Sequence, residues 1–235
     1  MPPIELSVII PSRNADVGLL TRALNEAWFL DAEACVWFDE DTPDNSKNMR
    51  SMLDMPDDWH RFYGRVGKIG AQNKALGLAT RKYVIYHGDD DYIGAGAVEL
   101  VQYLESNPSM AFAYGSQQYM GGRTDLVRPR QYVGDELYQC NLPLNGIVFR
   151  REVMLAVGGY RDILGDPMRP DQPEDYDLLL RIHEAGYVGA SVDTSEPVLF
   201  YTLSHSRSWA KMQDSADEVY RAFKAHHPKY TGGRL

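Results

Sequence analysis

The stretch from Tyr83 to Asp91 reads YVIYHGDDD, a short apolar segment that ends in three consecutive acids. A continuous apolar run of this length is typical of a strand buried on both faces of a sheet. Three adjacent carboxylates repel one another, so the run is costly unless solvent or a cation compensates it. Side chains alternate along an extended chain, which lets one acid face a divalent metal while its neighbour faces a sugar hydroxyl. Such oxygen ligands favour Mg²⁺ or Mn²⁺; a solvated turn is the alternative interpretation.

Outward from this stretch, short apolar runs alternate with segments of helical spacing. The expected strands are 6–10, 34–38, 62–66 and 83–86, and the expected helices are 17–30, 70–80 and 96–106. This alternation implies βαβ units and a mainly parallel sheet with helices on both faces, an α/β fold. Because ligands bind such sheets at the carboxyl ends of the strands, the candidate positions are 11–14, 39–44 and 88–91.

The second half of the chain is less regular. A hairpin is expected from 110–119 and 125–133, split by two glycines at 121 and 122, and residues 160–173 are expected to form a loop. The remaining expected elements are strands at 145–149 and 198–203 and helices at 151–157, 174–185 and 208–225. The tail from His226 to Leu235 is expected to fray.

Two further acid pairs and one histidine stand at ends of expected elements. Asp39 and Glu40 follow the second strand, where a carboxylate can accept a hydrogen bond from a nucleobase or a ribose hydroxyl; the alternative is a loop with helix-capping acids. Glu174 and Asp175 begin a helix, where acids favour the helix dipole but can also serve as a general base. His205 follows an apolar strand and is either a metal or phosphate ligand or a surface histidine.

The composition is that of an ordinary globular protein. The 235 residues are 44% hydrophobic and 24% charged, and the formal net charge of −9 makes a nucleic-acid partner improbable. The two cysteines do not form a disulfide framework, and no stretch approaches the ~18–20 apolar residues of a membrane span. The N-terminus lacks the features of a signal peptide, so a cytoplasmic location is expected. The sequence has no P-loop, GxGxxG or GxSxG motif at the positions that would support one.

Taken together, these segments resemble the GT-A glycosyltransferases, and specifically glycosyltransferase family 2. The resemblance spans about residues 6–205 and rests on five segments in the family's order. They are LSVIIPSRN (6–14), WFDEDTPDNS (37–46), the stretch from GAQNKAL to YVIYHGDDD (70–91), FRREV to VGGY (149–160) and EDYDLLLR (174–181).

The resemblance implies a GT-A fold, with one catalytic domain over 1–207, divided into a nucleotide-binding half (1–107) and an acceptor-side half (108–207), followed by a C-terminal helix and tail (208–235). It also implies the site residues. Around the nucleotide the resemblance places Pro11, Arg13, Asp39, Glu40 and Asp89. Near the metal it places Asp90, Asp91 and His205. At the reacting centre it places Asp175, as general base, with Glu174 beside it. Gln72 replaces the family's arginine, and Arg65, Lys68 or Lys74 can supply the missing cation near the nucleotide.

The activity implied by the resemblance is a metal-dependent inverting transfer of a hexosyl type. A nucleotide-sugar, most often a UDP-sugar, gives its sugar to an acceptor hydroxyl with Mn²⁺ or Mg²⁺ present. Two other hypotheses stay open: a nucleotidyltransferase of related fold, and a non-catalytic protein that binds nucleotide-sugars. Gln72 and Gly88, which stands where the family has its first acid, keep the latter open. No motif indicates the acceptor or the oligomeric state.

Overall fold

The computed structural model describes residues 4–13, 17–39, 60–88, 91–140, 145–166, 168–169, 173–202 and 216–232. Its strands are β1 (Leu6–Ser12), β2 (Glu33–Phe38), β3 (His60–Tyr63), β4 (Tyr83–Tyr86), β5 (Tyr92–Ile93), β6 (Met110–Tyr114), β7 (Gln117–Met120), β8 (Leu126–Val127), β9 (Ile147–Arg150), β10 (Val188–Ser191) and β11 (Leu199–Thr202). Its helices are α1 (Val17–Phe29), α3 (Gly67–Leu78), α4 (Gly96–Ser106), the 3₁₀ helix η1 (Gly134–Tyr138), α5 (Arg151–Ala156), α6 (Glu174–Glu184) and α8 (Ala216–His226).

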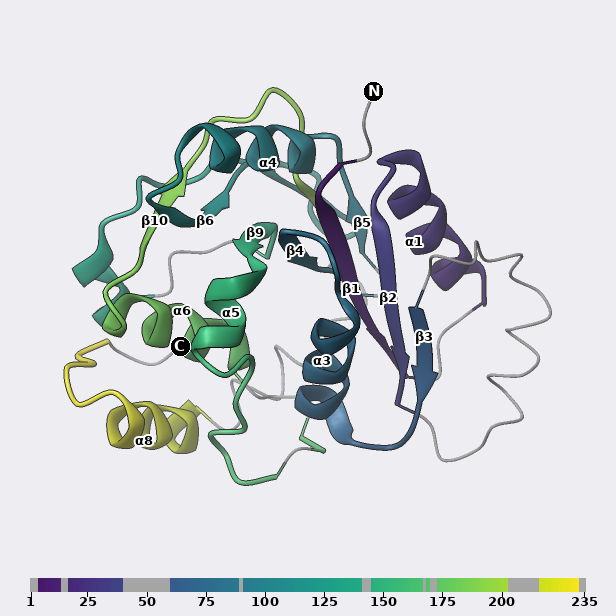
Figure 1. Ribbon diagram of the computed structural model, residues 1–235. Coiled ribbons are helices and arrows are strands. Elements are labelled where there is room, and N and C mark those ends of the chain that lie inside the picture. The colour runs from purple at the N-terminus through teal and green to yellow at the C-terminus, as the bar shows by residue number, and fades with distance from the viewer. Residues whose placement is uncertain are drawn as a thin grey trace.

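The central sheet is mostly parallel, which confirms the predicted fold class. Its strand order is β10-β6-β9-β4-β1-β2-β3, and only β9 runs antiparallel to its neighbours among these strands (Figure 1). A smaller second sheet has the order β5-β11-β7-β8. The parallel strands β1, β2 and β4 lie in the middle, so their carboxyl ends share one edge of the sheet.

Each face of the central sheet has its own hydrophobic core. Along β1, Val8 and Ile10 point into a core covered by α1 and α4, whereas Ile9 points into a core covered by α3, α5, α6 and α8. A strand that is buried on both faces needs apolar residues at every position, which is why this segment reads as an unbroken apolar run rather than an alternating one.

The first strand continues past the point where the sequence predicts its end. Pro11 belongs to β1 and pairs with Trp37 of β2. Proline has no N–H to give to a neighbouring strand. The other neighbour, β4, pairs with β1 only as far as Ile9, which lies opposite Tyr86, so no ladder hydrogen bond from Pro11 toward β4 is required.

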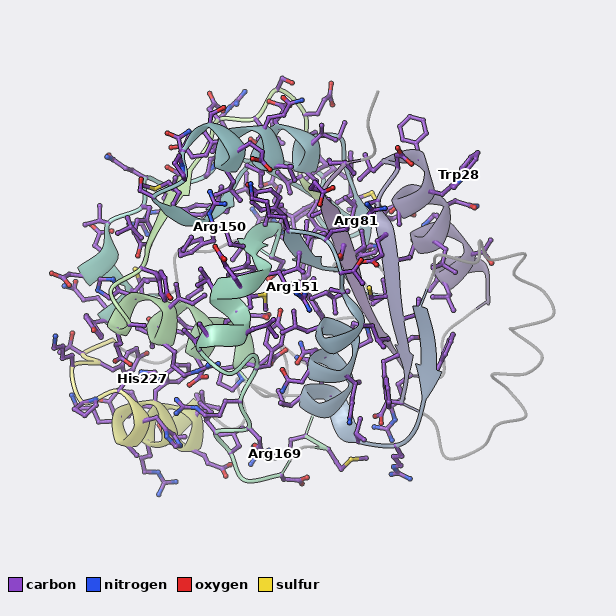
Figure 2. The ribbon with its side chains drawn as sticks, viewed as in Figure 1. Trp28, Arg81, Arg150, Arg151, Arg169 and His227 are labelled. Carbon is purple, nitrogen blue, oxygen red and sulfur yellow. The ribbon has the colours of Figure 1, made fainter. Side chains whose placement is uncertain are left out.

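Arg150 shows how a cation is accommodated inside this fold. Its side chain is buried, and its guanidinium donates to the carbonyl oxygens of Met110 (2.7 Å) and Leu104 (2.6 Å). Leu104 lies in the last turn of α4, where carbonyl groups lack helical partners and carry the negative end of the helix dipole. Arg150 therefore joins β9 to α4 and β6. Not every large side chain is buried: Trp28, near the end of α1, points outward and is 67% exposed (Figure 2).

The predicted hairpin at 110–119 and 125–133 is only partly correct. The first segment divides into β6, in the central sheet, and β7, in the second sheet, and β7 then pairs antiparallel with β8. The division falls at Gly115, where an added Cβ would lie 2.7 Å from side-chain carbons of Thr194 and Val198. This close approach permits the chain to pass from one sheet to the other only with glycine at that position.

The prediction that the C-terminal tail frays is wrong for its described residues. His227 and Tyr230 are fully buried, and the Tyr230 ring lies 5.3 Å from that of Phe223 and 6.0 Å from that of Tyr176. The backbone N–H of Gly232 donates to the carbonyl of Tyr138 at 2.8 Å. The tail is thus part of the second core rather than a loose end.

Candidate active site at the carboxyl edge of the sheet

Asp39 closes the carboxyl end of β2 and caps the following described helix. Its side chain is 4% exposed, and its Oδ1 accepts hydrogen bonds from the backbone N–H groups of Val66 (2.6 Å) and Gly67 (3.0 Å), at the start of α3. The first N–H groups of a helix lack helical partners, and a carboxylate there also favours the helix dipole. The capping interpretation of Asp39 is therefore confirmed, and its role toward a nucleotide stays a prediction.

Three other residues predicted to bind the nucleotide, Pro11, Arg13 and Lys74, are more exposed than Asp39. The carbonyl of Ser12, between Pro11 and the exposed Arg13, accepts from the N–H of Asp39 at 2.8 Å, so the ends of β1 and β2 are joined. Lys74 is exposed, and its ammonium lies 5.8 Å from the centre of the Trp37 ring, over β2. Glu40 lies outside the described residues.

Gln72 and Glu174 come together from segments that are 102 residues apart. Gln72 is fully buried on α3, and its Nε2 donates to Oε1 of Glu174 at 2.9 Å. The ammonium of Lys68, one turn earlier on α3, lies 2.5 Å from the same oxygen. Glu174 is 1% exposed at the first position of α6. These two contacts hold the start of α6 against the start of α3, at the carboxyl edge of the sheet.

Asp175 follows Glu174 in the first turn of α6 and is only partly exposed. Burial, together with the neighbouring charge of Glu174, raises the pKa of Asp175 to about 7, while the Lys68 ammonium acts in the opposite direction. A carboxylate with a pKa near neutrality can take a proton from a hydroxyl group at physiological pH. The side chain predicted to be a general base thus has the electrostatic setting that this chemistry needs.

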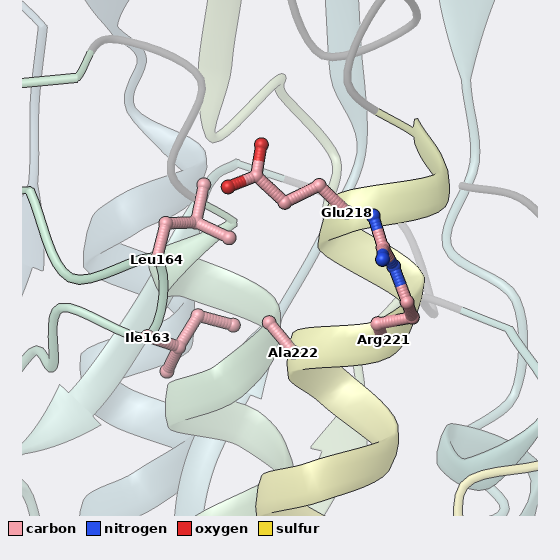
Figure 3. Close-up of a pocket in the computed structure, with 5 residues that line it drawn as sticks. All are labelled: Ile163, Leu164, Glu218, Arg221 and Ala222. Carbon is pink, nitrogen blue, oxygen red and sulfur yellow. The ribbon is translucent and has the colours of Figure 1, made fainter.

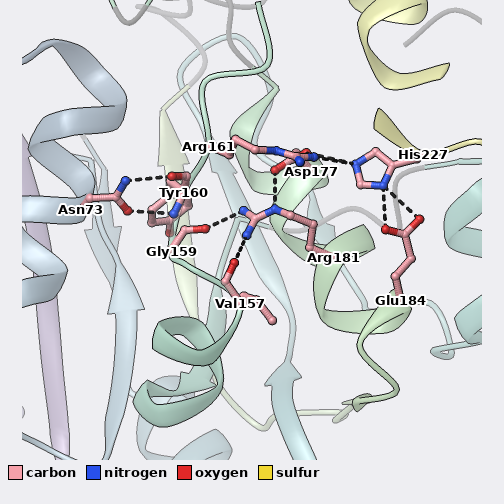
Figure 4. Close-up of polar contacts among 9 residues, drawn as sticks. All are labelled: Asn73, Val157, Gly159, Tyr160, Arg161, Asp177, Arg181, Glu184 and His227. Carbon is pink, nitrogen blue, oxygen red and sulfur yellow. Dashed lines mark hydrogen bonds and ion pairs between the residues drawn. The ribbon is translucent and has the colours of Figure 1, made fainter. Parts of the chain in front are cut away.

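Asn73, which the sequence motifs did not single out as a functional residue, ties α3 to the segment beside Asp175. Its Oδ1 accepts from the N–H of Tyr160 and its Nδ2 donates to the carbonyl of Tyr160, both at 2.8 Å (Figure 4). The preceding Gly159 has a φ of +68°, and a Cβ there would lie 2.4 Å from the Asn73 oxygen. Only glycine fits this turn. Burial and the charge of Asp175 raise the pKa of Tyr160 well above its usual value.

A buried ionic cluster is centred on Asp177, which lies in the same first turn of α6. Asp177 is fully buried and accepts from Arg161, from Arg181 (2.7 Å) and from His227 (3.0 Å), whose other ring nitrogen lies 3.0 Å from Glu184 (Figure 4). Burial raises the pKa of Asp177, but the hydrogen bonds outweigh this and hold it below its usual value. A buried charge is tolerated when its lone pairs are satisfied in this way.

The same cluster connects three separate segments. The Arg181 guanidinium also donates to the carbonyls of Val157 and Gly159, at 2.5 Å each, so it joins α6 to the turn that Asn73 holds. His227 brings in the C-terminal tail. The Asp177–Arg181 pair has the i,i+4 spacing of one helix face, but sequence periodicity carries no signal for the contacts with Arg161 and His227, which lie on distant segments.

Asp91 is the described member of the acid run. It is 8% exposed, and its Oδ1 accepts from the N–H of Thr202, the last residue of β11, at 2.9 Å. Asp89, Asp90 and His205 lie outside the described residues. Within the described part of the chain, no three His, Cys, Asp or Glu side chains are grouped to hold a metal.

The donor chemistry nevertheless fits a divalent cation. Three adjacent carboxylates at a strand end are hard oxygen ligands. The hydrogen bond between Asp91 and Thr202 joins the described member of the acid run to the end of β11.

Two further titratable side chains, Glu26 and His87, lie beside the acid run. Glu26 of α1 accepts from the N–H of Ile93 at 2.9 Å and lies 3.7 Å from Nε2 of His87. Burial, and then the charge of Arg22, lowers the pKa of His87 to about 3, while burial raises that of Glu26 to about 7. Glu26 thus contacts both flanks of the acid run, at residues 87 and 93.

A surface pocket of about 470 Å³ lies elsewhere, between the loop that follows Tyr160 and α8 (Figure 3). Its lining is Ile163, Leu164, Glu218, Arg221 and Ala222. This lining includes none of the predicted site residues. The convergence of titratable groups at the sheet edge is the better guide to chemistry, so we place the candidate site there.

Comparison with known proteins agrees with this arrangement. Residues 7–161 match the family model described as Glycosyl transferase family 2. The chain belongs to glycosyl transferase family 2. The match begins at the second residue of β1, includes Asp39, Gln72 and Asp91, and ends before α6. No protein with a curated description matches this family 2 member in sequence.

Solved structures show the same GT-A fold. The mannosyltransferase PcManGT from Pyrobaculum calidifontis, in complex with GDP-Man and Mn²⁺, superposes with a TM-score of 0.66 at 18% identity, over 99% of this chain and 66% of that one. Residues 1–349 of S. aureus TarS, in complex with UDP-GlcNAc, superpose with a TM-score of 0.66 at 12% identity, over 95% of this chain and 66% of that one. This family 2 member thus spans just under two thirds of either structure. Within its described residues, none of the helices has the length and hydropathy of a membrane-spanning segment.

Proposed function

We propose that the chain is a metal-dependent, inverting glycosyltransferase that moves a hexosyl group from a nucleotide-sugar, preferably a UDP-sugar, to an acceptor hydroxyl. The observation that carries this proposal is Asp175: a half-buried carboxylate with a pKa near 7, held at the carboxyl edge of the sheet by the contacts of Glu174. The family match, and the GDP-Man with Mn²⁺ and UDP-GlcNAc bound by structural neighbours, support a nucleotide-sugar donor.

In the proposed reaction, Asp175 accepts the proton of the acceptor hydroxyl as its oxygen attacks the anomeric carbon. The bond from that carbon to the diphosphate breaks in the same step, which inverts the anomeric configuration. Glu174 does not take part in proton transfer in this scheme, because Lys68 and Gln72 occupy its Oε1 and it holds α6 in place. Because its surroundings are poorly solvated, Asp175 binds a proton more tightly than a free aspartate does. It is therefore a stronger base near neutral pH.

Other residues would bind the donor. Pro11, Arg13, Asp39 and Glu40 would surround the nucleobase, Asp89 the ribose, and Gln72 and Lys74 the nucleotide more generally. Asp90 and Asp91, with His205, would hold Mn²⁺ or Mg²⁺, which supplies positive charge to the leaving diphosphate. We further propose a cytoplasmic location and a catalytic domain of residues 1–207, in nucleotide-side and acceptor-side halves (1–107 and 108–207), with 208–235 as a helix and tail.

Two variants test the proposal. Asp175→Asn is expected to abolish sugar transfer while nucleoside diphosphate still binds, and Asp135→Asn, at a side chain that is 91% exposed, is the matched control. Asp90→Ala is expected to abolish the Mn²⁺-dependent binding of a nucleoside diphosphate in calorimetry. Full transfer by the Asp175 variant would exclude it as the base. Release of pyrophosphate would instead indicate a nucleotidyltransferase, and binding of a nucleotide-sugar without any transfer would indicate a binding protein.

A further inference from the structure

Lys68 occupies an unusual position between two helix starts. It lies in the first turn of α3, its side chain is 30% exposed, and its ammonium is 2.5 Å from Oε1 of the buried Glu174. Gln72, one turn later, donates to the same oxygen. The amide fixes the position of the carboxylate but has no charge. Lys68 therefore supplies the positive charge at this contact.

The groups that face Asp175 come from three elements. Glu174, on its own helix, adds a negative charge, and Lys68, from α3, adds a positive one. Tyr160, from the segment after α5, is an uncharged phenol at neutral pH, as tyrosine ordinarily is, and burial raises its pKa further. Two adjacent carboxylates in a poorly solvated site repel each other, so one of them resists ionisation. An ammonium beside the pair opposes that repulsion.

We propose that Lys68 is a positioning residue that, through Glu174, sets the pH at which Asp175 becomes a base. The proposal rests on the proposed function, in which Asp175 is the proton acceptor. Its basis is geometric, because Lys68 and Gln72 together fix Glu174. Of these two side chains, only the Lys68 ammonium has a charge that can offset the one that Glu174 places next to Asp175. Without the Lys68 ammonium, Asp175 would keep its proton up to a higher pH and would be inactive as a base until that pH is reached.

The direct test is a carboxyl titration that needs no enzyme activity. The side-chain ¹³C signal of Asp175, assigned by its loss in Asp175→Asn, is followed with pH in the wild type, Lys68→Met and Lys68→Arg. We expect Lys68→Met to move the Asp175 titration upward by about one pH unit or more, and Lys68→Arg to restore it to near the wild-type position. Lys82→Met removes an exposed ion pair with Glu105 and is expected to move nothing. An unchanged Asp175 titration in a folded Lys68→Met would overturn the proposal, and Lys68→Gln replaces this variant if it does not fold.

The pH profile of sugar transfer separates this inference from the function beneath it. For Lys68→Met, the acidic limb of kcat/KM is expected to move up with the titration, which lowers the rate about tenfold on that limb. A purely structural role would lower the rate equally at all pH values. If the wild type transfers no sugar, the proposed function fails while the titration still decides the role of Lys68. The other case is that the wild type transfers sugar and Asp175→Asn does not. If the acidic limb of the Lys68→Met profile then coincides with that of the wild type, the proposed function stands and only the role of Lys68 is refuted.

Discussion

Replacing Asp175 with Asn should stabilise the protein, although it removes the proposed base. A free aspartate has a pKa of 3.8, and in the folded chain burial and Glu174 raise that of Asp175 to about 7. Between these two values the native carboxyl keeps a proton that the unfolded chain has lost. The free energy of unfolding therefore falls as pH rises through this window, and the full cost is present above pH 7. Asparagine has a similar shape and does not titrate, so the variant carries none of this cost.

The size of the effect follows from the shift. A change of about three pKa units corresponds to about 4 kcal/mol at alkaline pH. Because the Asp175 side chain is partly exposed, solvent screens part of this, and we expect a gain of about 2 kcal/mol. Urea denaturation followed by circular dichroism at about pH 5 and about pH 8.5 measures it. The gain should be larger at the higher pH, whereas Asp135→Asn should show none. An Asp175 variant that is no more stable than the wild type at the higher pH would refute this reasoning.

Four other substitutions, one of them a control, test the remaining structure by the same denaturation assay. Asp177→Ala should cost about 3–5 kcal/mol, because it leaves two arginines and a histidine without their buried partner. The control is Arg123→Ala, which breaks an exposed ion pair with Asp125 and should cost under about 1 kcal/mol. Tyr230→Ala should cost about 3–5 kcal/mol if the tail packs as described, and a cost near zero would mean that it does not. Asp39→Ala should cost about 1–2 kcal/mol through loss of the α3 cap, and an unchanged midpoint would contradict that contact.

The sequence predicts the buried framework well because burial leaves a local pattern. The expected strand 83–86 and helix 96–106 coincide with β4 and α4. The strand is an apolar run that stops at His87 and Gly88, and the helix has regular spacing and ends before an Asn-Pro pair. Both are decided by residues within the element itself.

The differences arise where a distant group decides the outcome. The helix expected at 70–80 begins instead at Gly67, because Asp39 caps it from another strand. The tail is expected to fray, yet His227 is buried against Asp177, 50 residues away. For the site, the acid pair at 174 and 175 could be identified from the sequence, but not the contacts of Lys68 and Gln72 that hold it.

The central claim is that this chain transfers a sugar from a nucleotide-sugar with Asp175 as the base. Phosphorus NMR of the wild type and Asp175→Asn, each with Mg²⁺, a panel of nucleotide-sugars and hydroxyl acceptors, tests this claim. We expect the wild type to release a nucleoside diphosphate from at least one donor, and the variant to do so at least about 10²-fold more slowly. Release of pyrophosphate, or equal rates for the two proteins, would contradict it.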